Sequence, residues 1–148
     1  SSIKNASQVF LGKSKKEAIS EEEMELTAEY WSTVASNMPD WQAALQKNVL
    51  TSELREQYIH AHGVMLQAMG NVGSALVTRK KKTWRQALKK LKKIDWSRAN
   101  KEWEGRALVH GRITKARTNV ILTGNLIKFY LGLSLDVNEE ELEGSFGK

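Results

Sequence analysis

The residues of this chain that best suit a chemical task are basic and amide side chains in two stretches. Residues 79–93 read RKKKTWRQALKKLKK and hold nine basic residues and no acidic one. Lysine and arginine neutralise phosphate groups, so this stretch predicts contacts to a DNA backbone. The residues expected to make these phosphate contacts are Lys80, Lys81, Lys82, Arg85, Lys89, Lys90 and Lys93.

The second stretch, residues 111–119, reads GRITKARTN and places basic and amide groups where a helix is expected to begin. Backbone N–H groups at a helix start favour anions, and such a helix suits a major groove. Arginine matches the edge of guanine and asparagine that of adenine. We expect base or register contacts from Arg112, Lys115, Arg117 and Asn119. Solvated helix starts often have this composition, so an ordinary surface is the alternative.

Two tryptophans and two arginines between these stretches allow two interpretations. Trp96, Arg98, Trp103 and Arg106 have the side chains that stack on and clamp a nucleic-acid strand. Tryptophans at such a junction more often fill a core, because each buries a large apolar surface. Both interpretations stay open for the tryptophans, and Arg98 and Arg106 are included among the expected DNA contacts.

The formal net charge of +6 is unevenly distributed along the chain. Residues 1–78 carry a net charge of −3, residues 79–135 one of +13 and residues 136–148 one of −4. Protein surfaces normally intersperse the two signs, so the positive middle predicts an anionic partner on one continuous patch. The alternative is that the positive charge is neutralised within the protein, by a basic helix face that lies near the glutamates of residues 21–29.

Groups for catalysis, metal binding or cofactor binding do not converge in the sequence. His60 and His62 stand two positions apart on an expected helix, about 200° from each other, and so do not share a metal ion. No GxxxxGK[ST] or GxGxxG motif occurs, and no serine has a base at a recognisable spacing. We therefore expect a protein that is not an enzyme and that needs no metal or cofactor.

Length and composition predict one soluble helical domain. The chain has 148 residues, one proline and no cysteine, which removes disulfide frameworks and thiolate metal sites. No stretch has the roughly 20 apolar residues of a membrane span, and no signal peptide is visible, so a cytoplasmic location is expected. The chain does not begin with methionine, which suggests a piece of a longer protein.

The first half of the chain predicts three helices. Ser20 and Glu23 have the spacing of a capping box for a helix over residues 21–36. Pro39 breaks that helix, and Asp40 suits the cap of a short helix from residue 41. Ser52 suits the cap of the longest helix, which runs to about residue 76. Its glycines at positions 63, 70 and 73 predict close packing against another helix.

The second half predicts a basic amphipathic helix from Thr83, with Trp84, Leu88, Leu91 and Ile94 facing inward. Residues 95–112 predict an irregular connection with a short helix. A long helix capped by Thr114 then ends at Gly132, and a short acidic turn follows. The expected fold is all-α, a single compact domain over residues 1–148 with about five or six helices and a basic face. Residues 79–135 form its DNA-binding part.

The sequence also resembles the C-terminal region of the DndB family over roughly residues 50–135. The matching segments are Tyr58-Ile59, His62-Gly63-Val64, Gly70, Gly73, residues 94–100 (IDWSRAN), 103–106 (WEGR), Gly111-Arg112, Lys115, Arg117, 119–123 (NVILT) and 131–133 (LGL). DndB proteins belong to bacterial systems that replace a non-bridging phosphate oxygen of DNA by sulfur. The resemblance implies a DNA-binding regulator that represses transcription of the modification genes.

Family members also carry an N-terminal Asp-Gly-Gln-His-Arg signature, which this chain lacks, as expected of a C-terminal fragment. Double-stranded DNA is the expected partner, and other proteins of the modification system and a second copy of the chain are further candidates. The alternative function is a scaffold module that binds an acidic protein within a modification or restriction complex. A third interpretation, an accessory part of a nuclease, needs metal ligands from another segment.

Overall fold

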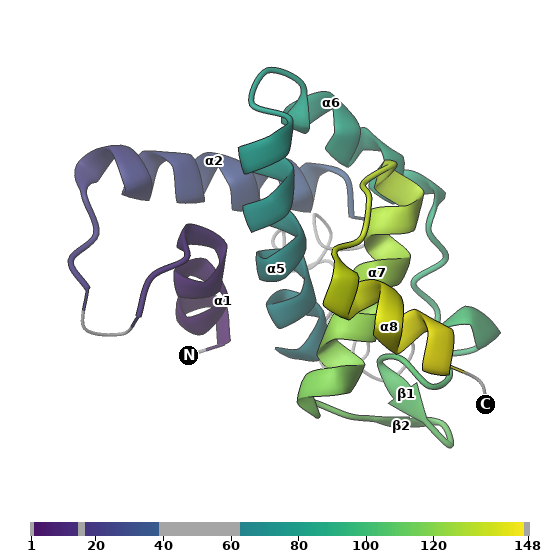
Figure 1. Cartoon of the computed structure of the whole chain (residues 1–148). Coiled ribbons are helices and arrows are strands. Elements are labelled where there is room, and N and C mark those ends of the chain that lie inside the picture. Colours follow the sequence, from purple (N-terminus) through teal and green to yellow (C-terminus); the bar gives the residue numbers. More distant parts are fainter. Residues whose placement is uncertain (1, 15–16, 39–62, 147–148) are drawn as a thin grey trace, which may run out of the picture.

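The computed structural model describes residues 2–14, 17–38 and 63–146. These residues form six α-helices, two short 3₁₀ helices and one two-stranded hairpin, which confirms the all-α expectation (Figure 1). The elements are α1 (Ser2–Leu11), α2 (Glu21–Ser36), α5 (Gly63–Arg79), α6 (Trp84–Ala87), η1 (Leu88–Lys93), η2 (Lys101–Trp103), β1 (Leu108–Val109), β2 (Arg112–Ile113), α7 (Arg117–Leu131) and α8 (Val137–Ser145).

Helix α5 stands at the centre of the fold, with α1 on one side and α7 on the other (Figure 1). α8 covers part of α7, and α2 crosses over α1 and α5. One hydrophobic core connects these elements, from Phe10 of α1 to Leu133 after α7. In the described ranges no helix is long and apolar enough to span a bilayer.

Two glycines of α5 allow other elements to approach it closely. A Cβ at Gly70 would lie 2.6 Å from the carbonyl oxygen of Ala6, and one at Gly73 would overlap the ring of Tyr30. That ring is fully buried and stacks on Phe10 at a centroid distance of 4.3 Å. The predicted close packing of these glycines is therefore confirmed.

Helix α2 begins as its sequence predicts. The Ser20 hydroxyl accepts a hydrogen bond from the backbone N–H of Glu23, whose carboxylate accepts one from the backbone N–H of Ser20. The capping box and the span 21–36 are thus confirmed. The caps predicted at Asp40 and Ser52, and both His60 and His62, lie outside the described residues.

The basic amphipathic segment folds differently from its prediction. It forms one short α-helical turn, α6, and continues as the 3₁₀ helix η1. Leu88, Leu91 and Ile94 are buried at intervals of three residues, which matches the three residues per turn of a 3₁₀ helix. The predicted inward face is confirmed, and so is Thr83 as the residue before the helix start, but the Thr83 side chain makes no capping hydrogen bond.

Residues 95–113 contain the predicted short helix, η2, and also a hairpin that was not predicted. His110 and Gly111 have φ angles of 52° and 77°, as a two-residue turn between β1 and β2 requires. Trp96 and Trp103 are 1% and 0% exposed and stack on each other at 5.6 Å. The core interpretation of these two tryptophans is therefore the correct one.

The last two helices differ from their predicted starts. α7 begins at Arg117 after Ala116, which has no capping side chain, so Thr114 is not its cap. Its predicted end at Gly132 is confirmed, with a left-handed φ of 75°. The acidic tail forms the full helix α8, which starts with a capping box between Asp136 and Glu139. Helix α1 was not predicted.

Candidate nucleic-acid interface

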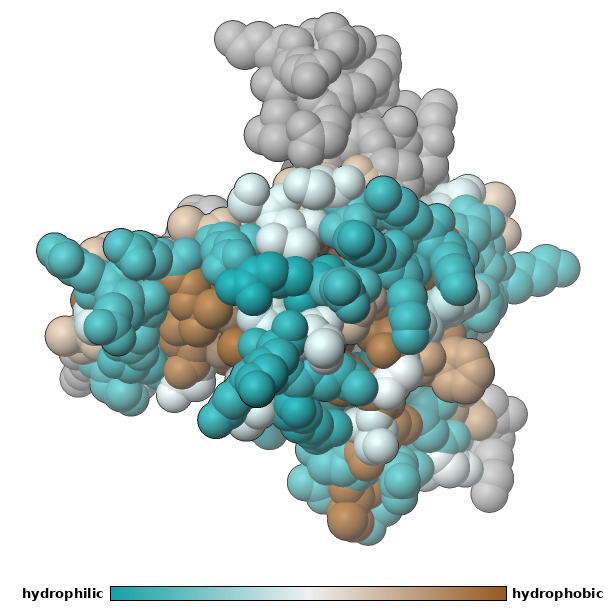
Figure 2. Space-filling view, turned by 90° about the horizontal axis from the view of Figure 1, so that it is seen from above, coloured by the Kyte–Doolittle hydropathy of each residue, from teal (hydrophilic) through white to brown (hydrophobic). Residues whose placement is uncertain are grey.

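The first basic region is the lysine segment, defined as residues 80–93. Burial of its apolar residues leaves the cations on the outside, where Lys80 is half-buried and the other predicted lysines are exposed. Seen from above, this end of the molecule is covered largely by hydrophilic side chains (Figure 2). Within the described residues, no ion pair involves Lys80, Lys81, Lys82, Lys89, Lys90 or Lys93.

Arg85 is the member of this segment that does meet the acidic helix α2. Its Nη2 donates to Oε1 of Glu29 at 2.7 Å, its Nε donates to the second carboxylate oxygen, and its guanidinium lies 4.4 Å above the Trp84 ring. The hydrogen bonds from Arg85 lower the pKa of Glu29, and the same bonds raise the pKa of Arg85. Among the described residues, internal neutralisation therefore accounts for Arg85 but for none of the lysines of this segment.

The second basic region is the hairpin segment, defined as residues 112–117. The side chains of Arg112, Lys115 and Arg117 are exposed at β2 and at the first turn of α7. Asn119 is different, because its Nδ2 donates to the carbonyl oxygen of Gly105 at 3.0 Å. That amide holds α7 to the preceding loop, so the hairpin segment offers three exposed cations.

Arg98 and Arg106 make contacts within the fold. The guanidinium of Arg98 donates to the carbonyl oxygen of Gly111 at 3.0 Å and so holds the hairpin turn. Arg106 is 9% exposed, donates to the Leu122 carbonyl oxygen at 2.7 Å and forms a two-pronged ion pair with Glu143 at 2.5 and 3.0 Å. Phe146 covers its guanidinium. Arg106 thus connects α7 and α8 and does not belong to the exposed basic surface.

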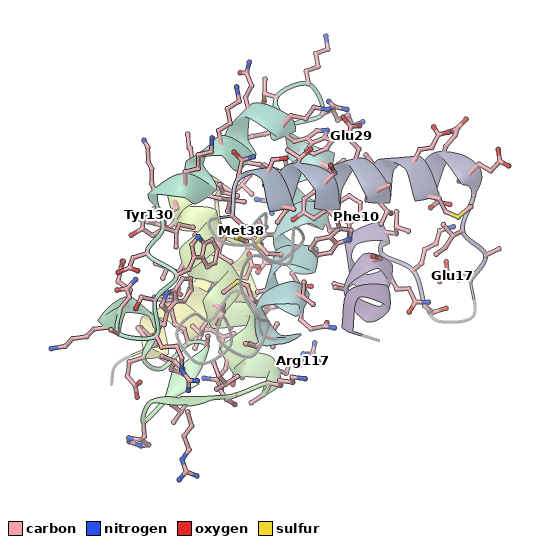
Figure 3. All side chains as sticks on the ribbon, turned by 180° about the vertical axis from the view of Figure 1, so that it is seen from behind. Phe10, Glu17, Glu29, Met38, Arg117 and Tyr130 are labelled. Atoms are coloured by element: carbon pink, nitrogen blue, oxygen red, sulfur yellow. The ribbon has the colours of Figure 1, made fainter. Side chains whose placement is uncertain are left out.

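The two basic segments lie at opposite ends of helix α7. The hairpin segment leads into its first turn, whereas Lys90 lies beside Gly132 at its last turn. With 15 residues, α7 separates them by roughly 21 Å. In Figure 3, Arg117 lies at the lower end of the molecule and Glu29, the partner of Arg85, at the upper end. The single continuous patch expected from the sequence is therefore two patches.

A groove joins these two ends along the outer face of α5. Its volume is about 940 Å³, and Arg79 lies at one end while Lys115 and Arg117 lie at the other. The α5 residues that line it between these cations are Gly63, Gln67, Asn71, Ser74, Ala75 and Thr78. This row, with its polar residues Gln67, Asn71, Ser74 and Thr78, was not predicted from the sequence. Its signal was the recurrence of polar residues every three or four positions opposite the apolar stripe of the same helix.

Metal-binding side chains do not gather in the part of the chain that the structure describes. Across residues 2–14, 17–38 and 63–146, no three histidine, cysteine, aspartate or glutamate residues lie where they could hold a metal ion.

Comparison with known proteins gives one family. The family model described as DndB, DNA-sulfur modification-associated, matches residues 1–134. The match extends to residue 1, whereas the resemblance seen in the sequence covered residues 50–135. That this segment is the C-terminal region of a longer protein stays a prediction. Neither a curated protein nor a solved structure matches the chain significantly.

Proposed function

The chain belongs to the DndB family of DNA-sulfur modification-associated proteins, and on this premise we propose that it is a DNA-binding module that represses transcription of the modification genes. In this proposal the chain acts in the cytoplasm by binding duplex DNA and catalyses no reaction. Family membership supports the link to DNA sulfur modification, and the charge distribution supports the binding mode.

The observation that carries the proposal is that no lysine of the lysine segment forms an ion pair with any other residue that the structure describes. Buried leucines at positions 88 and 91 hold this segment on the core, so its cations project from a fixed backbone. A surface of lysines without carboxylate partners is costly in self-repulsion unless an anion neutralises it. A DNA backbone supplies regularly spaced anions and releases counterions on binding.

The hairpin segment supplies the second contact in this proposal. Arg112 and Arg117 have the planar fork that suits phosphate or guanine, and both are exposed. Phosphates along one DNA strand are about 3.4 Å apart, so the roughly 21 Å between the two segments corresponds to about six base pairs. Residues 122–128 of α7 are buried, so one duplex that meets both segments would pass beside this helix and not along it.

The scaffold function is the second candidate, and an apolar surface favours it. Phe129 and Val137 are 77% and 70% exposed. Phe129 borders a pocket of about 310 Å³ lined also by Leu126, Leu133 and Leu135. Exposed apolar residues beside an apolar pocket are typical of a protein-binding site.

A binding comparison tests these candidates. Labelled duplex from the region upstream of the modification genes is titrated near physiological salt, and a scrambled duplex of equal length and composition is the control. The repressor function predicts tighter binding to the upstream duplex, by about a thousandfold if discrimination is typical of specific DNA-binding proteins. Equal, weak binding to both duplexes would favour the scaffold function instead.

A further inference from the structure

We propose that the groove between α5, α7 and the start of α8 seats one extended strand of a nucleic acid. This inference rests on the proposed DNA-binding function and adds to it a binding site for a single strand. The groove is distinct from the exposed surface of the lysine segment, although it begins next to it at Arg79.

The size of the groove suits an extended chain. Its floor on α5 runs from Gly63 to Arg79, which is roughly 24 Å at the rise of an α-helix. The groove has a volume of about 940 Å³ and is open to solvent. At about 3.4 Å per phosphate, this length corresponds to about seven phosphates of one strand.

The charge of the groove is positive. Lys128 is buried and donates to Glu139 Oε2 at 2.5 Å, so this pair contributes no net charge. Asp136 is the other carboxylate in the lining, and its Oδ1 accepts from the backbone N–H of Glu139 at 2.8 Å. Arg79, Lys115 and Arg117 remain against that one carboxylate. Cations at both ends of the floor suit a ligand that carries negative charge along its length.

The neutral residues between these cations offer what a nucleotide needs. The side chains of Gln67, Asn71 and Ser74 donate and accept hydrogen bonds, as phosphate oxygens and base edges require. Val9, Val120 and Ile121 add apolar walls for sugars and base faces. An acidic peptide that fills only the groove would meet the same cations. A nucleic-acid strand that extends beyond both ends of the groove would also meet the lysine segment next to Arg79 and Arg112 next to Lys115.

The test compares the same added charge inside the groove and away from both basic segments. Gln67→Glu adds one negative charge to the groove, and Ser14→Glu adds the same charge at an exposed position beside Lys13. Binding of a labelled 12-nucleotide single strand is measured by fluorescence anisotropy. We expect Gln67→Glu to weaken binding about tenfold and Ser14→Glu to weaken it less than about threefold. The reverse order would overturn the inference.

Further measurements separate the possible failures. Thr78→Glu, on the exposed lip of the groove, repeats the test if Gln67→Glu alters the circular dichroism spectrum. If the wild-type chain binds duplex DNA but neither groove variant changes single-strand binding, the groove inference fails and the DNA-binding function stands. If the wild-type chain binds no nucleic acid, both fail. Displacement of the strand by an equal concentration of a twelve-glutamate peptide would also overturn the groove assignment.

Discussion

Removing three lysines from the lysine segment should make DNA binding less dependent on salt. The triple variant Lys89→Gln, Lys90→Gln and Lys93→Gln keeps the long side chains but removes three cations that lack an ion-pair partner among the described residues. If each of these three lysines neutralises one phosphate, the slope of log affinity against log salt should become less negative by about 2.7.

This change of slope corresponds to a large difference in affinity loss. Between 50 and 200 mM salt, the variant should lose about 40-fold less affinity than the wild-type chain. The assay is fluorescence anisotropy with a labelled 20-base-pair duplex at four salt concentrations. Lys13→Gln is the control, because Lys13 pairs with Glu23 away from both basic segments and its loss should leave the slope unchanged. A triple variant with the wild-type slope would refute the assignment of these lysines to the interface.

Three further predictions concern stability. Gly73→Ala should destabilise the fold by about 1–3 kcal/mol in urea unfolding, because the buried Tyr30 ring blocks the new methyl group. Gly144→Ala is the control, because the space around Gly144 is open, and it should be neutral or stabilise the fold by up to about 1 kcal/mol. Hydrogen bonds from Lys13 and Ser20 lower the pKa of Glu23 from 4.5 to about 2, and those from Arg106 lower the pKa of Glu143. The stabilisation from Glu23 is therefore complete above about pH 4.5 and lost as pH falls toward 2. The stabilisation from Glu143 is lost as pH falls below the ordinary range of a glutamate, and Glu143→Gln should flatten the decline of urea midpoints at acid pH. Asp136→Ala should remove the cap of α8 and cost about 1 kcal/mol in the same assay, and an unchanged midpoint would contradict that role.

The parts of the fold that were predictable from the sequence depend on local chemistry. Ser20 and Glu23 satisfy each other within one helical turn, and Gly132 ends α7 because it adopts a left-handed φ. The inward positions of Trp84, Leu88, Leu91 and Ile94 follow from spacing alone. The 3₁₀ form of η1 was available from the same spacing, because intervals of three residues favour three residues per turn over 3.6.

The parts that were not predictable depend on distant partners. Thr114 looked like a helix cap, but its hydroxyl accepts from the backbone N–H of Ala116, and the helix starts later. The burial of Arg106 depends on Glu143, which is 37 positions away in the sequence. Composition predicted how much positive charge the middle of the chain carries. It did not predict that α7 separates this charge into two segments, because that separation depends on the tertiary fold.

The stacked indoles of Trp96 and Trp103 have a spectroscopic consequence. Both rings are shielded from water and lie 5.6 Å apart, close enough for their excited states to couple. The native protein should therefore show blue-shifted emission and a paired band in near-ultraviolet circular dichroism, both of which disappear on denaturation. The paired band comes from the segment between the two basic regions, whereas the other three tryptophans of the chain also contribute to the emission. The band would reveal without any label whether a bound polyanion disturbs the packing beneath it.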